Sequence, residues 1–220
     1  ASGQLSLGAA GFMSVGAYVG ALLSLKADLP IVVGILAGGF VAALVAVIIG
    51  LPTTRLKGLY LAIATLGFGE VVRVIFLNLD VTNGALGLSG IPSIPQELTN
   101  FAYEIDIDGL MGIDAVAWGN IMAIIILLIV LIFIIAFCVR INNSRVGRAF
   151  AAIKADDHAA ELMGINVVYY KMMAFIIGAF IAGIGGGLYA HITNFINPTD
   201  FSYHKVVQIL LFPVFGGSNV

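Results

Sequence analysis

Residues 115–139, AVAWGNIMAIIILLIVLIFIIAFCV, form an unbroken run of 25 residues without a charged side chain. A helix of about 20 residues rises about 1.5 Å per residue and so crosses the roughly 30 Å hydrocarbon core of a bilayer. Residues 1–25, 29–54 and 172–199 also lack Asp, Glu, Lys and Arg. Because lipid offers the backbone no hydrogen bonds, each run is expected to be helical. The sequence therefore predicts an all-α, polytopic transmembrane helix bundle.

The composition of the whole chain agrees with this prediction. Hydrophobic residues make up 60% of the 220 positions and charged residues only 10%. Soluble domains carry about 25% charged residues, so this chain has too few charges to cover a surface that faces water. The net charge of -2 says little about partners, and no basic patch in the sequence suggests a nucleic-acid partner. The single cysteine, Cys138, excludes a framework of internal disulfides.

We predict six membrane spans along the chain. They cover residues 5–25, 31–51, 58–79, 118–139, 172–194 and 204–220. The first of them is rich in glycine, so a broken or re-entrant course stays open for it. Because the chain starts inside an apolar segment and stops 15 residues after Lys205, we expect further helices beyond both ends. We treat residues 1–220 as one incomplete membrane domain.

The charges between the spans predict the orientation. The segment 80–117 contains six acidic residues and neither Lys nor Arg. The segment 140–171 contains the basic residues Arg140, Arg145, Arg148, Lys154 and Lys171. Lys and Arg favour the cytoplasmic side of a membrane. We therefore expect 80–117 to be an extracytoplasmic loop and 140–171 to lie in the cytoplasm.

Within 140–171, the residue pattern predicts two consecutive helices. Ser144 is suited to cap a helix that runs to about residue 155, and Asp156 is suited to cap a shorter helix that runs to about residue 163. Gly164 then stands at the position that favours a left-handed backbone after a helix. We expect Ala159 and Ala160 to form an exposed face that fits a groove on a partner protein. The alternative is an interfacial helix that only links two spans.

Five stretches of the chain, taken in order, resemble one known family. They are ASGQLSLGAAGFMSVGAY (1–18), GLPTTRLKGLYLAIATLGFGEVVR (50–73), TNGALGLSGIP (82–92), SRVGRAFAAIKADDHAAELMGIN (144–166) and KMMAFIIGAFIAGIGGGLYA (171–190). They are similar to the branched-chain amino acid permeases of the LivM type, which are subunits of ABC importers. Ala159, Ala160 and Gly164 match the spacing of the EAA loop of such permeases. The chain departs from the family at His158, where Glu is usual, and at Ala9, where His is frequent.

The resemblance implies a multi-pass permease domain in the cell (cytoplasmic or inner) membrane. It implies a second permease subunit, two ATP-binding subunits on the cytoplasmic face and an extracytoplasmic substrate-binding protein as partners. ATP hydrolysis would belong to those ATP-binding subunits, so this chain would be a transport subunit without catalytic residues, cofactor or metal. The residues implied in coupling to the ATP-binding subunits are Ala149, Ile153, Asp157, His158, Ala159, Ala160 and Gly164.

A second group of residues is a candidate for the substrate pathway. It comprises Ser6, Glu70, Arg73, Thr82 and Gly84. A lone charge near the middle of a membrane costs about 2.5–3.5 kcal/mol on the insertion scale, so Glu70 and Arg73 should face protein or water. They lie three residues apart, and a mutual ion pair with a purely structural role is the alternative interpretation. His191 is interpreted as a hydrogen-bonded residue between helices.

Other functions stay open at this point. Urea or amide permeases and sugar permeases share the same superfamily. A different class would be an intramembrane enzyme built around Glu70, Arg73 and His191, and a third would be a passive channel. The acidic run with His158 does not predict a metal site, because consecutive residues of a helix point about 100° apart. The EAA-like motif favours the importer, since neither an enzyme nor a channel needs it.

Overall fold

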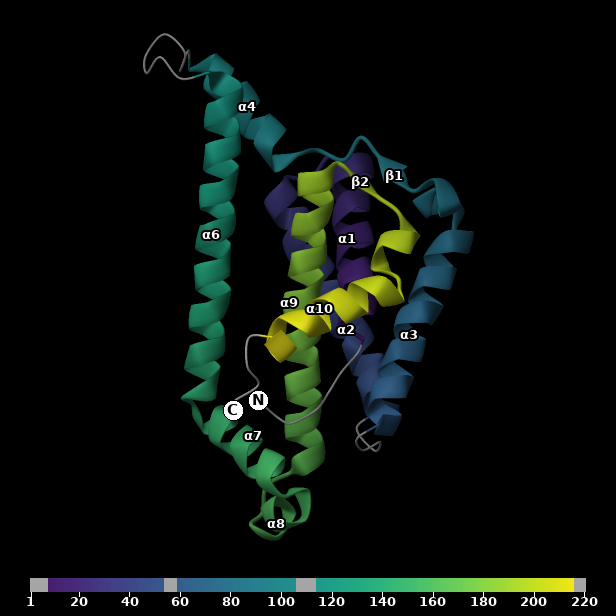
Figure 1. Ribbon diagram of the computed structural model, residues 1–220, viewed down its shortest axis with the longest axis vertical. Coiled ribbons are helices and arrows are strands. Elements are labelled where there is room, and N and C mark those ends of the chain that lie inside the picture. Colours follow the sequence, from purple (N-terminus) through teal and green to yellow (C-terminus); the bar gives the residue numbers. More distant parts are fainter. Residues whose placement is uncertain (1–7, 54–58, 106–113, 216–220) are drawn as a thin grey trace.

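The computed structural model describes residues 8–53, 59–105 and 114–215, and it is a bundle of long helices (Figure 1). Within these residues, five helices are long and apolar enough to cross a membrane. They are α1 (Ala9–Lys26), α2 (Ile31–Thr53), α3 (Leu59–Asn78), α6 (Ala115–Asn142) and α9 (Val167–Thr193). The prediction of an all-α polytopic membrane bundle is thereby confirmed.

The helices begin and end where short polar residues or proline interrupt the apolar runs. Pro30 precedes α2, and its carbonyl accepts the first N–H bonds of that helix. The Asp114 carboxylate accepts a hydrogen bond from the N–H of Val116, the second residue of α6. The Asn166 side chain accepts one from the N–H of Tyr169 in the first turn of α9. α9 ends at Thr193 and is followed by the capping residue Asn194, whose φ of 58° is left-handed. These caps set the helix boundaries within a few residues of the predicted spans.

The expected sixth span is only partly described. Helix α10 (Tyr203–Phe215) has 13 residues and rises about 20 Å, which is shorter than the hydrocarbon core. Residues 216–220 of the predicted span lie outside the described residues. Within its described length, α10 contacts α1 and the turn that precedes it.

Glycine faces hold the centre of the bundle together. α9 packs against both α1 and α2, and α1 also packs against α2. Four glycines are buried at these contacts. They form two pairs at a spacing of four residues, Gly34 with Gly38 and Gly183 with Gly187, which places the small residues on one face of each helix. Gly178 differs, because it is exposed and a Cβ at that position would have no neighbour within 4 Å. Gly178 and Ala182 have the same four-residue spacing, so this spacing alone does not indicate close packing at Gly178.

Helix α6 stands apart from this centre (Figure 1). It packs against α4 (Ile94–Glu104) at one end and α7 (Arg145–Ala155) at the other. Between α6 and the pair α2 and α9 lies an apolar cavity of about 810 Å³, lined by residues that include Ile35, Phe133 and Ile184. Most of α6, including Cys138, is therefore exposed within this chain.

The segments with opposite charge lie at opposite ends of the bundle (Figure 1). The acidic end holds the 3-10 helices η1 (Asp80–Thr82), η2 (Gly84–Leu86) and η3 (Pro198–Phe201), the strands β1 (Leu88–Ser89) and β2 (Phe195–Ile196), and α4. The two strands pair antiparallel, with Leu88 opposite Ile196. The basic end holds α7 and α8 (Asp157–Leu162). Residues 82–92 do not form a regular α-helix, and neither the pairing of β1 with β2 nor helix α4 was predicted from the sequence.

Candidate functional site

The two helices at the basic end begin at the predicted caps. The Ser144 hydroxyl accepts hydrogen bonds from the N–H groups of Val146 and Gly147, at 3.1 and 3.4 Å, and starts α7. The Asp156 carboxylate accepts from the N–H groups of His158 and Ala159, at 2.8 and 3.2 Å, and starts α8. Both side chains satisfy N–H groups that have no partner inside the helix.

The end of α8 also follows the prediction. Gly164 has a φ of 81°, in the left-handed region that favours glycine. The N–H of Ile165 donates to the carbonyl of Ala160 at 3.1 Å, and the N–H of Gly164 donates to the carbonyl of Glu161 at 3.0 Å. These two bonds form a Schellman motif, which satisfies the last carbonyls of the helix. α8 is thus a single short helix with a defined start and a defined stop.

Burial divides the residues expected at the coupling surface. Ala149, Ile153 and Ala160 are buried within the chain, whereas His158 and Ala159 are exposed. The expectation that Ala160 lies on an exposed face is therefore wrong. Because α7 and α9 also pack against α8, one side of this short helix faces the chain itself. Gly164 is exposed beyond the end of the helix.

Two apolar side chains at the tip of α8 were missed by sequence reasoning. Leu162 is 90% exposed and Met163 is 83% exposed. They follow the buried Ala160 and lie next to Gly164, at the far end of the molecule from the acidic segment (Figure 1). Exposed large apolar side chains that lie together often mark a contact surface, whereas single ones are common on protein surfaces. The signal in the sequence was their place directly before the helix-ending glycine.

Asp157 forms an ion pair across the turn between α8 and α9. Its Oδ2 lies 2.5 Å from Nζ of Lys171, and the two side chains are 25% and 8% exposed. From the sequence, Lys171 was noted only as one of the five basic residues in segment 140–171. Its position within the otherwise apolar start of α9 was the signal that it needs an acidic partner.

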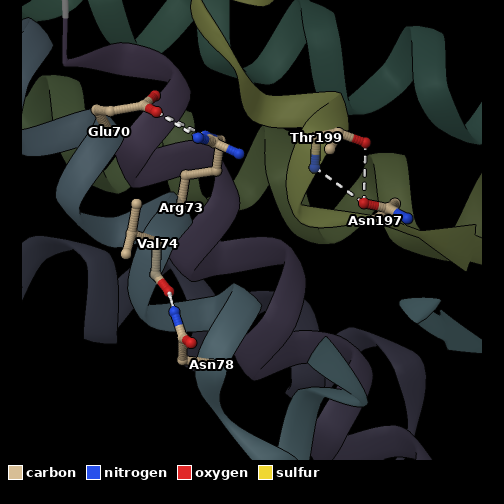
Figure 2. Close-up of polar contacts among 6 residues, drawn as sticks. All are labelled: Glu70, Arg73, Val74, Asn78, Asn197 and Thr199. Atoms are coloured by element: carbon tan, nitrogen blue, oxygen red, sulfur yellow. Dashed lines mark hydrogen bonds and ion pairs between the residues drawn. The ribbon is translucent and has the colours of Figure 1, made fainter. Parts of the chain in front are cut away.

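Glu70 and Arg73 interact with each other on α3. Figure 2 shows the Glu70 carboxylate and the Arg73 guanidinium pointing toward one another, and Nε of Arg73 donates to Oε1 of Glu70 at 2.9 Å. The mutual ion pair considered as the structural alternative is therefore present. It lies within one helix, so it does not join α3 to another helix of the bundle. Glu70 is 48% exposed and Arg73 is 22% exposed, on a face of α3 that the chain does not cover.

The remaining candidates for the substrate pathway have local roles. Thr82 is buried, and its hydroxyl donates to the carbonyls of Phe76 and Leu79, so it closes the end of α3. Gly84 follows with a φ of 53°. Ser6 lies outside the described residues. The structure brings Glu70 and Arg73 together but does not place Thr82 or Gly84 beside them, and contact with substrate stays a prediction for all of these residues.

His191 joins α9 to α1. Its side chain is buried, Nδ1 lies 2.7 Å from the carbonyl oxygen of Gly187, and Nε2 lies 2.9 Å from Oγ of Ser24. A carbonyl oxygen can only accept, so Nδ1 carries the proton, and Nε2 of a neutral ring accepts from the Ser24 hydroxyl. The interpretation of His191 as a hydrogen-bonded residue between helices is confirmed.

Over residues 1–220, the chain matches the sequence profile described as "Branched-chain amino acid transport system / permease component". The chain belongs to this permease family. Among its relatives are the high-affinity branched-chain amino acid transport system permease protein LivM of Salmonella typhimurium and LivM of Escherichia coli. Each of these is 33% identical to it over 98% of the chain.

The chain spans about half the length of the curated relatives it matches, 53% for both bacterial LivM proteins. A probable LivM permease of Methanocaldococcus jannaschii is 27% identical over 82% of the chain and 49% of that protein. The permease protein LivH of Escherichia coli is 34% identical over 35% of the chain and 25% of its own length. No solved structure matches the chain. As a member of this family with five candidate spans among its described residues, the chain is a multi-pass membrane permease component.

Proposed function

We propose that this chain is a LivM-type permease subunit of an ABC importer, which moves branched-chain or related amino acids into the cell while partner subunits hydrolyse ATP. The observation that carries the proposal is α8, a separately capped helix with an exposed apolar tip at the basic end of a membrane bundle. The family match over the whole chain supports the substrate class. The proposed location is the cytoplasmic membrane, with α8 in the cytoplasm.

The tip of α8 is the proposed contact with the ATP-binding subunits. Leu162 and Met163 together with the side-chain-poor Ala159 form a small apolar surface that the chain leaves uncovered. Side chains of this kind stabilise an interface when they enter a pocket that excludes water. His158 lies beside them and is also exposed, so it belongs to the same proposed contact.

The uncovered face of α3 is the proposed contact with the second permease subunit. Tyr60, Ile63 and Val71 are exposed on this helix, and the Glu70–Arg73 pair lies about midway along it. Charged side chains at this depth are costly in lipid, so they face protein or a water-filled route. A second permease packed against α3 would keep the pair out of lipid, and a polar route for a zwitterionic solute would run between the two subunits.

The test is uptake by the complete transporter in proteoliposomes. The full chain is reconstituted with the second permease, the ATP-binding subunits and the substrate-binding protein, and uptake of labelled leucine is measured with and without ATP. We expect uptake that requires ATP and is competed by isoleucine and valine but not by urea or a sugar. Leucine uptake of equal rate without ATP would show a passive channel, and competition by urea or a sugar alone would show a different cargo.

A further inference from the structure

We propose that the ion pair between Lys171 and Asp157 is the link through which a displacement of α8 moves α9. Lys171 is thereby a positioning residue for coupled transport. This inference rests on the proposed function, because it assumes that partner subunits move α8. The two residues are 14 positions apart in sequence, on either side of the turn that connects α8 to α9.

The acidic partner lies at the start of α8. Asp156 accepts the capping hydrogen bonds, and Asp157 is the first helical residue, so the two neighbouring carboxylates have separate roles. A negative charge in this first turn is favourable with respect to the helix dipole. The carboxylate of Asp157 is therefore held at a defined position on α8, and from there its Oδ2 contacts Lys171.

The basic partner lies where a cation is least favourable. Lys171 is the fifth residue of α9, close to the helix end that carries the positive end of the dipole, and its side chain is 8% exposed. A buried ammonium group requires a nearby anion. Arg145, Arg148 and Lys154 are exposed by contrast. The burial of Lys171 beside Asp157 thus distinguishes this pair from the exposed charges around it.

The pair suits a mechanical role better than a stabilising one. Buried ion pairs often contribute little net stability, because removing two charges from water costs about as much as their attraction returns. They are nevertheless specific in direction and distance, and here the pair joins the outermost helix to a membrane-spanning helix. Without it, α8 and α9 would still be joined by the turn at 163–166 and by the packing of α8 on the chain.

Displacement of α9 would in turn move the centre of the bundle. α9 contacts α1 and α2 backbone to backbone, because Gly183 packs against Gly16 and Gly39 without intervening side chains. Such a contact leaves little room for one helix to shift while the other stays in place. The structure therefore contains a continuous set of contacts from Asp157 through Lys171 and α9 to α1 and α2.

The experiment compares variants in the complete reconstituted transporter. Lys171→Met and Asp157→Asn remove one charge each at nearly constant size, and the double variant removes both. For each we measure co-purification of the ATP-binding subunits, ATP hydrolysis and leucine uptake. We expect normal co-purification and an increase of about tenfold in ATP hydrolysed per leucine taken up, within the usual range of coupling between two sites. The double variant should be no worse than either single variant, because both singles break the same link.

Two controls separate a lost link from a lost charge. Glu161→Gln removes an exposed acid on the same helix, and it should leave the ratio of hydrolysis to uptake unchanged. The paired change Lys171→Arg with Asp157→Glu keeps an ion pair and should restore the wild-type ratio to a large extent. If Lys171→Met yields too little folded protein, Asp157→Asn still permits the comparison, because the Asp157 side chain is less buried than that of Lys171.

The inference and the proposed function fail differently. Suppose the wild-type transporter takes up leucine with ATP, and both Lys171→Met and Asp157→Asn hydrolyse as much ATP per leucine as the wild type. This result would overturn the inference but not the proposed function. The inference would also be overturned if Glu161→Gln raised the ATP hydrolysed per leucine as much as the single variants do. Additive increases of this ratio in the double variant would overturn it as well. A wild-type complex that shows no ATP-dependent uptake would overturn the proposed function itself.

Discussion

Gly16 of α1 lies so close to Gly183 of α9 that a Cβ added to Gly16 would overlap the Gly183 carbonyl. Gly38 of α2 approaches the same place from the other side, since a Cβ on Gly38 would overlap the carbonyl of Gly16. Three helices thus meet at their backbones. Close approach of this kind is how membrane helices gain packing energy where the hydrophobic effect between them is weak.

Replacing Gly183 by Ala should therefore destabilise the bundle. The new methyl group would come within 2.7 Å of Cβ of Ala42 and within 3.0 Å of Cα of Gly39. We expect the free energy of unfolding to fall by about 1–3 kcal/mol, as is usual for an overpacked core. Thermal unfolding of the detergent-purified complex measures this change. Gly185→Ala is the matched control on the same helix, because a Cβ there meets nothing within 4 Å. Equal melting temperatures for the two variants would contradict the packing described.

Replacing Gly164 by Val should impair coupling without filling any space. A Cβ at Gly164 has no neighbour within 4 Å, so the whole effect comes from its φ of 81°. The strain of a left-handed backbone is about 1–2 kcal/mol for an L residue, and the end of α8 should shift to relieve it. We expect ATP hydrolysis that is no longer matched by leucine uptake. Gly164→Asn, which tolerates this backbone, should retain most of the coupling, and unchanged uptake in the Val variant would exclude a role for this helix end.

Arg substitutions at two adjacent alanines should have different effects. Ala159 is exposed, so Ala159→Arg should leave the chain folded and weaken co-purification of the ATP-binding subunits. Ala160 is buried, so Ala160→Arg should force α8 away from α7 and α9 and lower the yield of folded protein. Size-exclusion chromatography measures folding, and affinity pull-down measures the partner contact. If Ala159→Arg binds the ATP-binding subunits at the wild-type level, the contact surface lies elsewhere.

Removing the Tyr18 hydroxyl should not destabilise the chain. In the part of the chain that the structure describes, the Tyr18 hydroxyl and the Ser14 hydroxyl are buried on α1 without a hydrogen-bond partner. Tyr18→Phe keeps the ring stacked on Phe76 and should leave the free energy of unfolding unchanged or raise it by about 1 kcal/mol. Ser24→Ala is the contrasting change, since it removes the hydroxyl that pairs with His191 and should cost about 1–3 kcal/mol. A clearly lower free energy of unfolding in Tyr18→Phe would show that the Tyr18 hydroxyl has a hydrogen-bond partner in the assembled protein.

The long helices were predictable because their signal is local and repeated. A span such as α2 consists of more than 20 apolar residues, and lipid leaves a helix as the solution for such a run. The caps of α7 and α8 were predictable for a similar reason, since Ser144, Asp156 and Gly164 act on backbone groups within three or four residues. Predictions that depend on neighbouring residues in the chain therefore agreed with the structure.

Predictions that depend on residues far apart in the chain did not agree with the structure. α8 has six residues, fewer than two turns, so its sequence holds no periodic pattern that could place Ala160 inside and Ala159 outside. The pairing of β1 with β2 joins residues about a hundred positions apart through two residues in each strand. Gly178 has the same spacing as the packed glycines but faces away from them. In each case the outcome is decided by which helix or strand lies opposite, and that information is not local.

The isolation of α6 has a consequence for how this protein can change over evolutionary time. Ala115, Gly119 and Ala123 are buried near the start of that helix, whereas its remaining length is largely uncovered by the chain. Exchanges among Leu, Ile, Val and Phe along that length would leave hydropathy and internal contacts intact, so homologous chains should diverge there quickly. At Gly16 and Gly183 the same lineages should accept almost no alternative, because any heavier residue would push apart helices that touch at their backbones.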